Sequence, residues 1–147
     1  MSDTHTYILF VVAGTTYGLR SDHVLHIEMI EHVTPVPNAP PFVEGVVFSR
    51  GQVVPVVNLR LRFGFERAPF DVRTRLLVVQ DGNRRLGLIA DDAREFTPIA
   101  DSAIQPPGEA IQGLSGQYLA GVATLGERIV LVLNIHEVVD RVPTAAA

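Results

Sequence analysis

The chain of 147 residues contains no cysteine and no tryptophan, and aromatic residues make up only 7% of it. The lack of cysteine excludes disulfides, thiolate catalysis and cysteine-ligated zinc. The scarcity of aromatic residues argues against a stacking platform for single-stranded nucleic acid, and a formal net charge of -4 argues against a broad basic face. Arg60, Arg62 and Arg67 leave open a local basic patch, although a solvated rim of the fold is the favoured interpretation. We therefore expect no nucleic-acid partner.

Long hydrophobic runs are also missing, since no apolar stretch approaches the roughly 20 residues that span a bilayer. The first five residues, Met1–His5, lack the positive charge and the apolar segment of a secretory signal. These absences predict a cytoplasmic protein with no direct insertion into a membrane. The balance of 47% hydrophobic and 19% charged residues is typical of one compact globular unit.

Motifs for catalysis and metal binding are missing as well. The five histidines are accompanied by neither an HExxH pattern nor clustered carboxylates. The adjacent Asp91 and Asp92 diverge as neighbours in the chain, so they indicate a turn rather than an acid–base dyad. Ser49 lacks the GxSxG elbow of a nucleophile, and no Walker or Rossmann glycine pattern occurs. The sequence therefore predicts no catalytic residue, no metal and no cofactor, and it indicates a binding module rather than an enzyme.

What the chain does contain is a series of short runs rich in Val, Ile and Leu, broken by Gly, Pro, Asn and Asp, which is typical of an all-β protein. The expected strands are Tyr7–Ala13, Thr16–Arg20, a bent Val24–Val33, Val46–Phe48, Val53–Val57, Leu76–Gln80, Arg84–Ala90, Ala93–Ile99, Tyr118–Thr124 and Arg128–Leu133. Four prolines within residues 34–41 predict an extended loop. Leu59–Phe65 suits a helical turn, and Asn134 can cap a short terminal helix over Ile135–Val139. Residues 141–147 are expected to form a flexible tail.

A weak internal repeat runs through the chain. Its clearest block pairs Val53–Leu59 with Ile129–Ile135 at a constant offset of 76 residues, which we count from the sequence. Other positions with matching residue types are Gly18 with Gly87, Phe42 with Tyr118, Gly45 with Gly121 and Val46 with Val122. The alternative interpretation is that any two hairpins rich in Val and Ile look alike, but glycine and asparagine positions agree as well as apolar ones. The repeat therefore predicts two copies of one five-stranded unit.

Short, strongly twisted sheets of that size close into small barrels, which removes exposed edges. We therefore expect a single domain over residues 6–140 that contains two barrels with a groove between them. Barrel 1 is expected at approximately residues 14–72, and barrel 2 at approximately residues 7–13 together with 73–140.

One segment carries a specific resemblance. Its residues are Thr34-Pro35-Val36-Pro37-Asn38-Ala39-Pro40, Phe42-Val43-Glu44-Gly45, Arg50-Gly51, Val54-Pro55-Val56, Asn58-Leu59-Arg60 and Phe63-Gly64. With these motifs the chain resembles the CheW domain over roughly residues 6 to 140. The resemblance implies two intertwined five-stranded SH3-like β-barrels with a short C-terminal helix. It also implies a non-catalytic adaptor that couples the cytoplasmic signalling tip of methyl-accepting chemoreceptors to the regulatory domain of a CheA-type histidine kinase, and that is recruited to chemoreceptor clusters.

The resemblance also implies where partners bind. The receptor-side candidates are Val24, His26, Gly45, Phe48, Ser49 and Arg50. In this group Gly45 would allow a receptor helix to approach the backbone closely, and Arg50 would place a guanidinium on helix carbonyls or a carboxylate. The structural alternatives are a strand-end bend at Gly45, an internal hydrogen bond at Arg50 and core packing at Val24.

The chain departs from the family pattern at several of these positions. His26 stands where a Glu is usual, which could break an ion pair with Arg50. Phe48 and Ser49 stand where Asn and Leu are usual, and Asn58 replaces a common Asp. These departures leave open the alternative of a divergent adaptor that binds receptor but not kinase in a non-standard pathway. A separate and less favoured alternative is a small-barrel module that binds nucleic acid.

Overall fold

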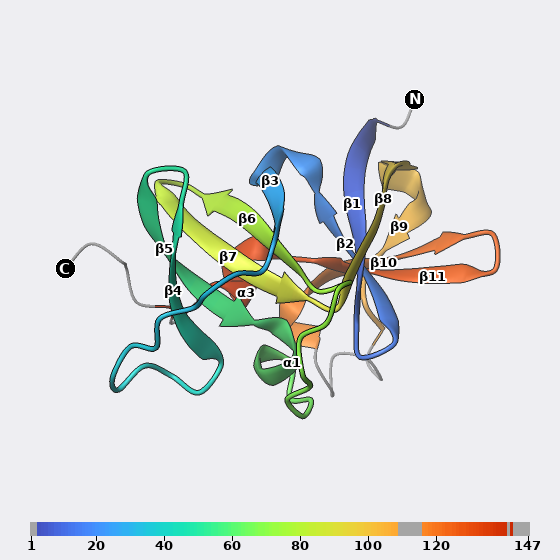
Figure 1. The fold of residues 1–147 in the computed structure, drawn as a ribbon. Helices are drawn as coiled ribbons and strands as arrows, with labels where there is room; N and C mark the ends of the chain where they lie inside the picture. Colours follow the sequence, from blue (N-terminus) through green and yellow to red (C-terminus); the bar gives the residue numbers. More distant parts are fainter. Residues whose placement is uncertain (1–2, 109–115, 141, 143–147) are drawn as a thin grey trace.

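The computed structural model of the protein describes residues 3–108, 116–140 and 142, which form two neighbouring β-sheets (Figure 1). The six-stranded sheet consists, in spatial order, of β8 (Asp92–Ala100), β1 (Thr4–Val12), β2 (Thr15–Arg20), β11 (Arg128–Leu133), β10 (Leu119–Leu125) and β9 (Ile104–Gln105). The five-stranded sheet consists of β3 (Val24–Met29), β6 (Arg75–Asp81), β7 (Arg84–Ala90), β5 (Gln52–Asn58) and β4 (Val43–Ser49). The short helices are α1 (Leu59–Arg62) and α3 (Ile135–Val138), with 3₁₀ turns η1 (Ser21–His23), η2 (Asp101–Ala103) and η3 (Gly116–Tyr118).

These elements confirm the all-β prediction and the short C-terminal helix. One sheet has six strands instead of five because the two-residue β9 pairs with β10. No helix among the described residues is long and apolar enough to cross a membrane. Of the tail predicted over residues 141–147, all but Val142 lies outside the described residues.

Each sheet takes strands from both halves of the chain, so the two sheets are intertwined. The hairpin β1–β2 joins strands β8–β11, and the hairpin β6–β7 joins strands β3–β5. Each hairpin joins its sheet through one pair of parallel strands. These pairs are β11 with β2, at Val132↔Gly18, and β5 with β7, at Val56↔Gly87. Pro55 lies just before that second pair begins, so the N–H that it lacks is not required there.

The sheets do not divide the chain at the expected barrel boundaries of 14–72 and 7–13 plus 73–140. Residues 15–20 belong to the six-stranded sheet, and residues 75–90 belong to the five-stranded sheet. The physical reason is a crossing after each hairpin, at η1 and again between β7 and β8, which carries the chain from one sheet to the other. A repeat in the sequence locates equivalent strands, but it contains no information on such an exchange.

The repeat itself is visible in local geometry. Strand pair β4–β5 has a register shift between Val43 and Gly45, and β10–β11 has one at the matching place before Gly121. Asn58 caps α1 by accepting a hydrogen bond from the Leu61 amide, and Asn134 caps α3 in the same way. The 76-residue offset therefore relates two copies of one β-hairpin that is followed by a capped helical turn.

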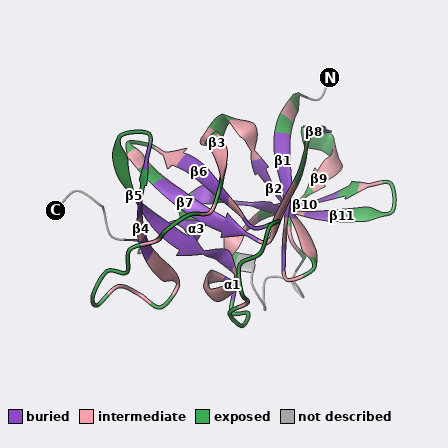
Figure 2. Cartoon of the chain, viewed as in Figure 1, coloured by how far each residue is buried: buried purple, intermediate pink, exposed green. Residues whose placement is uncertain are grey.

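Apolar side chains form three cores. The largest contains residues of both sheets, among them Ile8 and Phe10 of β1, and so joins the sheets to each other. The alternate β1 residues Tyr7 and Leu9 face a second core inside the six-stranded sheet, and a third core lies inside the five-stranded sheet. The central strands are thus buried on both faces, as Figure 2 shows in purple.

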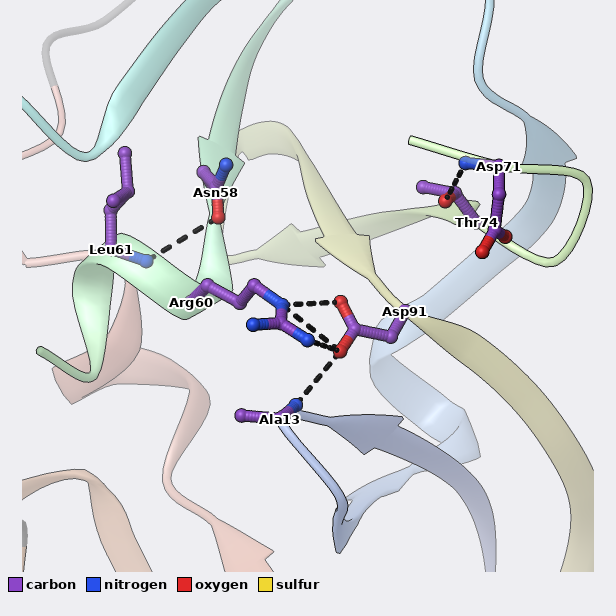
Figure 3. A network of polar contacts seen from close by, with 7 residues as sticks. All are labelled: Ala13, Asn58, Arg60, Leu61, Asp71, Thr74 and Asp91. Atoms are coloured by element: carbon purple, nitrogen blue, oxygen red, sulfur yellow. Dashed lines mark hydrogen bonds and ion pairs between the residues drawn. The ribbon is translucent and has the colours of Figure 1, made fainter. Parts of the chain in front are cut away.

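A cluster of polar contacts, here called the clasp, surrounds Asp91, where the chain crosses from β7 to β8 (Figure 3). The Arg60 guanidinium donates from Nε and Nη2 to the Asp91 carboxylate, with distances of 2.7 to 3.1 Å. Asp91 also accepts a hydrogen bond of 2.8 Å from the backbone amide of Ala13 in the β1–β2 turn. These bonds to Asp91 raise the pKa of Arg60 above its ordinary value. The clasp therefore fixes α1, the β1–β2 turn and the start of β8 relative to one another.

The predicted strand over Val24–Val33 is too long, since β3 ends at Met29. The chain then runs without regular structure to Thr34, which makes an isolated bridge with Val46. The proline-rich loop 34–41 contains no helix, as expected. The early end of β3 matters because the segment that follows forms one wall of a groove.

Candidate functional site

The most prominent groove among the described residues, with a volume of about 740 Å³, lies beside the five-stranded sheet. One wall comes from the end of β3 and the segment after it, and the other comes from the β4–β5 hairpin. The residues that give the groove its character are Glu28, Met29, Phe48, Ser49, Arg50 and Val53. Three of the six predicted site residues, Phe48, Ser49 and Arg50, are among them.

The tight turn of the β4–β5 hairpin positions Arg50. Ser49 pairs with Gln52, so the turn has two central residues, Arg50 with φ of 48° and Gly51 with φ of 85°. Left-handed φ at both positions matches the twist of the flanking strands. The Arg50 side chain is 68% exposed, and the one ion pair that it makes with a described residue, Glu28, has a Nε–Oε1 distance of 3.8 Å. Arg50 is therefore available to an external partner.

Glu28 is the centre of a polar cluster that joins the two walls of the groove, β3 and the β4–β5 hairpin. The Ser49 hydroxyl donates to both carboxylate oxygens of Glu28, at 3.0 and 3.2 Å. His26 Nε2 lies 3.1 Å from Ser49 Oγ and 3.2 Å from Glu28 Oε1. His26 and Glu28 are two residues apart on β3, so their side chains share one face of the strand. The cluster holds a carboxylate in a fixed position with 27% of the side chain exposed.

Apolar side chains flank this carboxylate. Phe48, Val53 and Met29 are all exposed, and Phe48 pairs directly with Val53 across the hairpin. A cluster of exposed apolar side chains around a few ordered polar groups is the usual composition of a site that binds a protein partner.

The repeat supplies an internal comparison for this hairpin. At the 76-residue offset, Phe48 and Ser49 correspond to Thr124 and Leu125 on β10. On β10 the exposed position is the polar Thr124, and the apolar Leu125 packs against a core. On β4 the order is inverted, because Phe48 is 76% exposed and Ser49 is only 7% exposed. Folding alone favours the arrangement on β10, so the inversion on β4 indicates a surface kept for binding.

Val24 and Gly45 are not part of the groove's lining. Val24 is half-buried and packs against the core that joins the sheets. Gly45 is buried with φ of 145°, and a Cβ atom there would lie 2.0 Å from the Thr34 carbonyl oxygen. The space that a Cβ atom at Gly45 would need is therefore already occupied by the chain itself. These observations agree with core packing at Val24 and with a bend in the strand at Gly45, and a receptor contact at either position stays a prediction.

Glu28, Met29 and Val53 line the groove but were not among the residues predicted from the sequence. Glu28 was detectable, since it follows His26 by two residues in a predicted strand and must share its face. Val53 was detectable from the register of the hairpin, which places it opposite Phe48. Met29 belongs to the groove because β3 ends there, and no feature of the sequence indicated that end.

The three arginines that left a basic patch open are engaged within the chain. Arg60 binds Asp91, and Arg67 pairs with Glu44. Arg62 donates to three backbone carbonyls at the end of α3, at 2.7 to 3.2 Å. These contacts support the interpretation that the three arginines belong to a solvated rim of the fold, where each guanidinium binds acceptors of the chain itself.

One group of potential metal ligands occurs among the described residues, and it was not predicted from the sequence. Asp3, His5 and Asp101 come together because β1 pairs with β8. The Arg20 guanidinium lies 3.1 Å from His5 Nδ1, and His5 Nε2 lies 3.6 Å from Asp101. Both ring nitrogens of His5 therefore already face partners within the chain, so this group is better described as a surface network of opposite charges.

Comparisons with known proteins place this geometry in context. The profile of the family described as "CheW-like domain" matches residues 6–142. The chemotaxis protein CheW of Klebsiella aerogenes is 29% identical over 134 residues, which covers 91% of this chain and 81% of that protein. The FrzA protein of Myxococcus xanthus is 30% identical over 139 residues, which covers 91% and 84%. The crystal structure of the scaffolding protein TtCheW from Thermoanaerobacter tengcongensis matches with a TM-score of 0.86 and 26% identity, over 95% of this chain and 94% of that one.

Proposed function

Because the chain belongs to the CheW-like domain family, we propose that it joins the signalling tip of chemoreceptors to the regulatory domain of a CheA-type histidine kinase. Its general role as a chemotaxis coupling adaptor, predicted from the sequence, is confirmed by the family and by the relatives it matches. The proposal extends to a non-catalytic mode of action, to residues 6–140 acting as one domain, and to recruitment to chemoreceptor clusters.

One observation supports the receptor side of this proposal more than any other. The β4–β5 hairpin exposes Phe48 and buries Ser49, in the reverse of the order on its repeat counterpart. An exposed aromatic ring beside a groove is a typical anchor for a helical partner. Arg50, on the turn of the same hairpin, adds a mobile cation for carbonyl or carboxylate groups.

The proposed binding of the kinase is supported by the architecture of the chain. The resemblance implies that the regulatory domain of the kinase has the same double-barrel fold, and that its contacts with such adaptors run from barrel to barrel. Two intertwined sheets provide the chain with separate surfaces, so a receptor in the groove leaves the six-stranded sheet available. Transient signalling contacts bury little area, and we expect dissociation constants on the order of micromolar.

The experiment is a calorimetric titration of the protein, and of its Arg50→Glu and Arg50→Ala variants, with a fragment of the cognate receptor tip. The wild type should bind saturably, and Arg50→Glu should bind at least about tenfold more weakly, as is usual when an interface arginine is lost. Both variants should melt close to the wild type, because Arg50 is exposed and makes only one long ion pair.

The Arg50→Ala variant is the control for Arg50→Glu. Arg50→Ala separates loss of the cation from the repulsion that a new carboxylate would create beside Glu28. An Arg50→Glu variant with native melting and native affinity would contradict the receptor contact proposed at Arg50. A variant that unfolds would assign Arg50 to the stability of the hairpin.

A further inference from the structure

We propose that Glu28 is a second, independent anchor of the groove, and that the occupant is a receptor helix that presents an arginine or lysine to this carboxylate between apolar side chains. This inference rests on the proposed function, since it names the chemistry of the partner at the same site.

The first argument is that Glu28 has unused capacity to accept hydrogen bonds. A carboxylate has about four lone-pair positions. The partners of Glu28 among the described residues are the Ser49 hydroxyl, which it shares between its two oxygens, and His26 at 3.2 Å. Arg50 Nε, at 3.8 Å, is beyond hydrogen-bond distance. A half-buried carboxylate with free lone pairs is stabilised by any donor that the partner brings.

The second argument is preorganisation. Ser49 is buried and His26 is half-buried, so neither donor can easily turn away from Glu28. The carboxylate therefore keeps its position before the partner arrives, and little side-chain entropy is lost on binding. Arg50, which is 68% exposed, has no comparable support.

The third argument is charge complementarity. Glu28 and Glu31 line the groove together with Arg50 and His32, and the Arg50 guanidinium is largely in solvent, beyond hydrogen-bond distance of Glu28. The apolar Met29, Phe48 and Val53 leave the carboxylate in surroundings of lower dielectric, where an opposite charge is attracted more strongly than in water. A basic side chain that is flanked by apolar ones on a helix matches this arrangement.

The test compares Glu28→Gln with Glu127→Gln in calorimetric titrations with the receptor-tip fragment. Glu127 is an exposed carboxylate in the turn of the counterpart hairpin, so its replacement removes the same charge far from the groove. We expect Glu28→Gln to bind roughly tenfold more weakly and Glu127→Gln to bind within about twofold of the wild type. The loss should shrink as salt is added, because it is electrostatic.

A double-mutant cycle with Arg50→Ala separates two roles of Glu28. If Glu28 contacts the partner itself, Glu28→Gln weakens binding further in the Arg50→Ala background. If Glu28 only positions Arg50, the double variant binds as weakly as Arg50→Ala alone, which overturns the inference.

A second measurement does not depend on the stability of Glu28→Gln. Each exposed Arg or Lys of the receptor fragment is changed to Glu in turn and titrated against the wild-type protein. At least one change should weaken binding to the wild-type protein by roughly tenfold or more, in line with the loss expected for Glu28→Gln. Uniform binding by all fragments overturns the inference while the proposed function stands. A folded wild type that binds no receptor fragment overturns both.

Discussion

Replacement of Gly45 by alanine should destabilise the protein strongly, although no partner is involved. Gly45 has φ of 145°, a region that side-chain-bearing residues rarely adopt. A Cβ atom built there lies 2.0 Å from the Thr34 oxygen and 2.9 Å from the Pro35 Cα. Both neighbours are backbone, so they cannot rotate away as the end of a side chain would.

The magnitude follows from these contacts. Backbone strain at such a position costs about 1–3 kcal/mol. Displacement of Thr34 also breaks its two hydrogen bonds with Val46, which are 2.9 and 2.8 Å long, at about 1 kcal/mol each. The sum is about 3–5 kcal/mol. For a chain of this size, a melting temperature roughly 10 °C lower is expected.

The assay is thermal unfolding followed by circular dichroism, with Gly64→Ala as the matched control. Gly64 also has a left-handed φ, of 87°, but its Cβ would meet nothing within 4 Å. The free energy of unfolding of the control should therefore fall by only about 1 kcal/mol, and its melting temperature by about 3 °C. If Gly45→Ala melts no lower than Gly64→Ala, the close approach of Thr34 is not what requires glycine, and a role in partner binding regains support.

Two further predictions concern charges outside the groove. Asp91→Ala should lower the free energy of unfolding, measured by chemical denaturation, by about 2 kcal/mol, because Arg60 and one backbone amide lose their shared acceptor. An unchanged midpoint would show that the clasp contributes nothing to stability. The pKa of His136 is raised by its hydrogen bond to Asp81. The stabilisation from this pair is therefore fully present below the ordinary imidazole pKa, and it is lost as the pH rises through the raised pKa. Asp81→Asn should move the His136 titration, followed by NMR, to lower pH; an unmoved titration would contradict this cause.

Much of the fold could be predicted because the strands, turns and caps depend on local pattern. The Val and Ile runs, and Asn134 before α3, indicated their elements directly. The exchange of hairpins could not be predicted in this way, since it depends on which core each strand enters. β1 is apolar on both faces and suits either sheet.

The site was predicted in part for a similar reason. The resemblance indicated Phe48, Ser49 and Arg50, and these residues do lie together at the groove. Gly45 belongs to the same family motif, but its function in the fold became clear only from the position of Thr34. Glu28 became prominent only when the distances to Ser49 and His26 were known. A motif groups residues by their order in sequence, whereas a binding surface groups them by the direction of their side chains.

The most direct test of the adaptor account is a pair of calorimetric titrations with the regulatory domain of the cognate CheA-type kinase. The first uses the protein alone, and the second uses the protein already saturated with the receptor-tip fragment. The account predicts saturable binding in both, with similar affinity, because the two partners occupy different surfaces. Failure of the kinase domain to bind a folded sample that still binds the receptor fragment would contradict coupling, and it would leave an adaptor for the receptor alone.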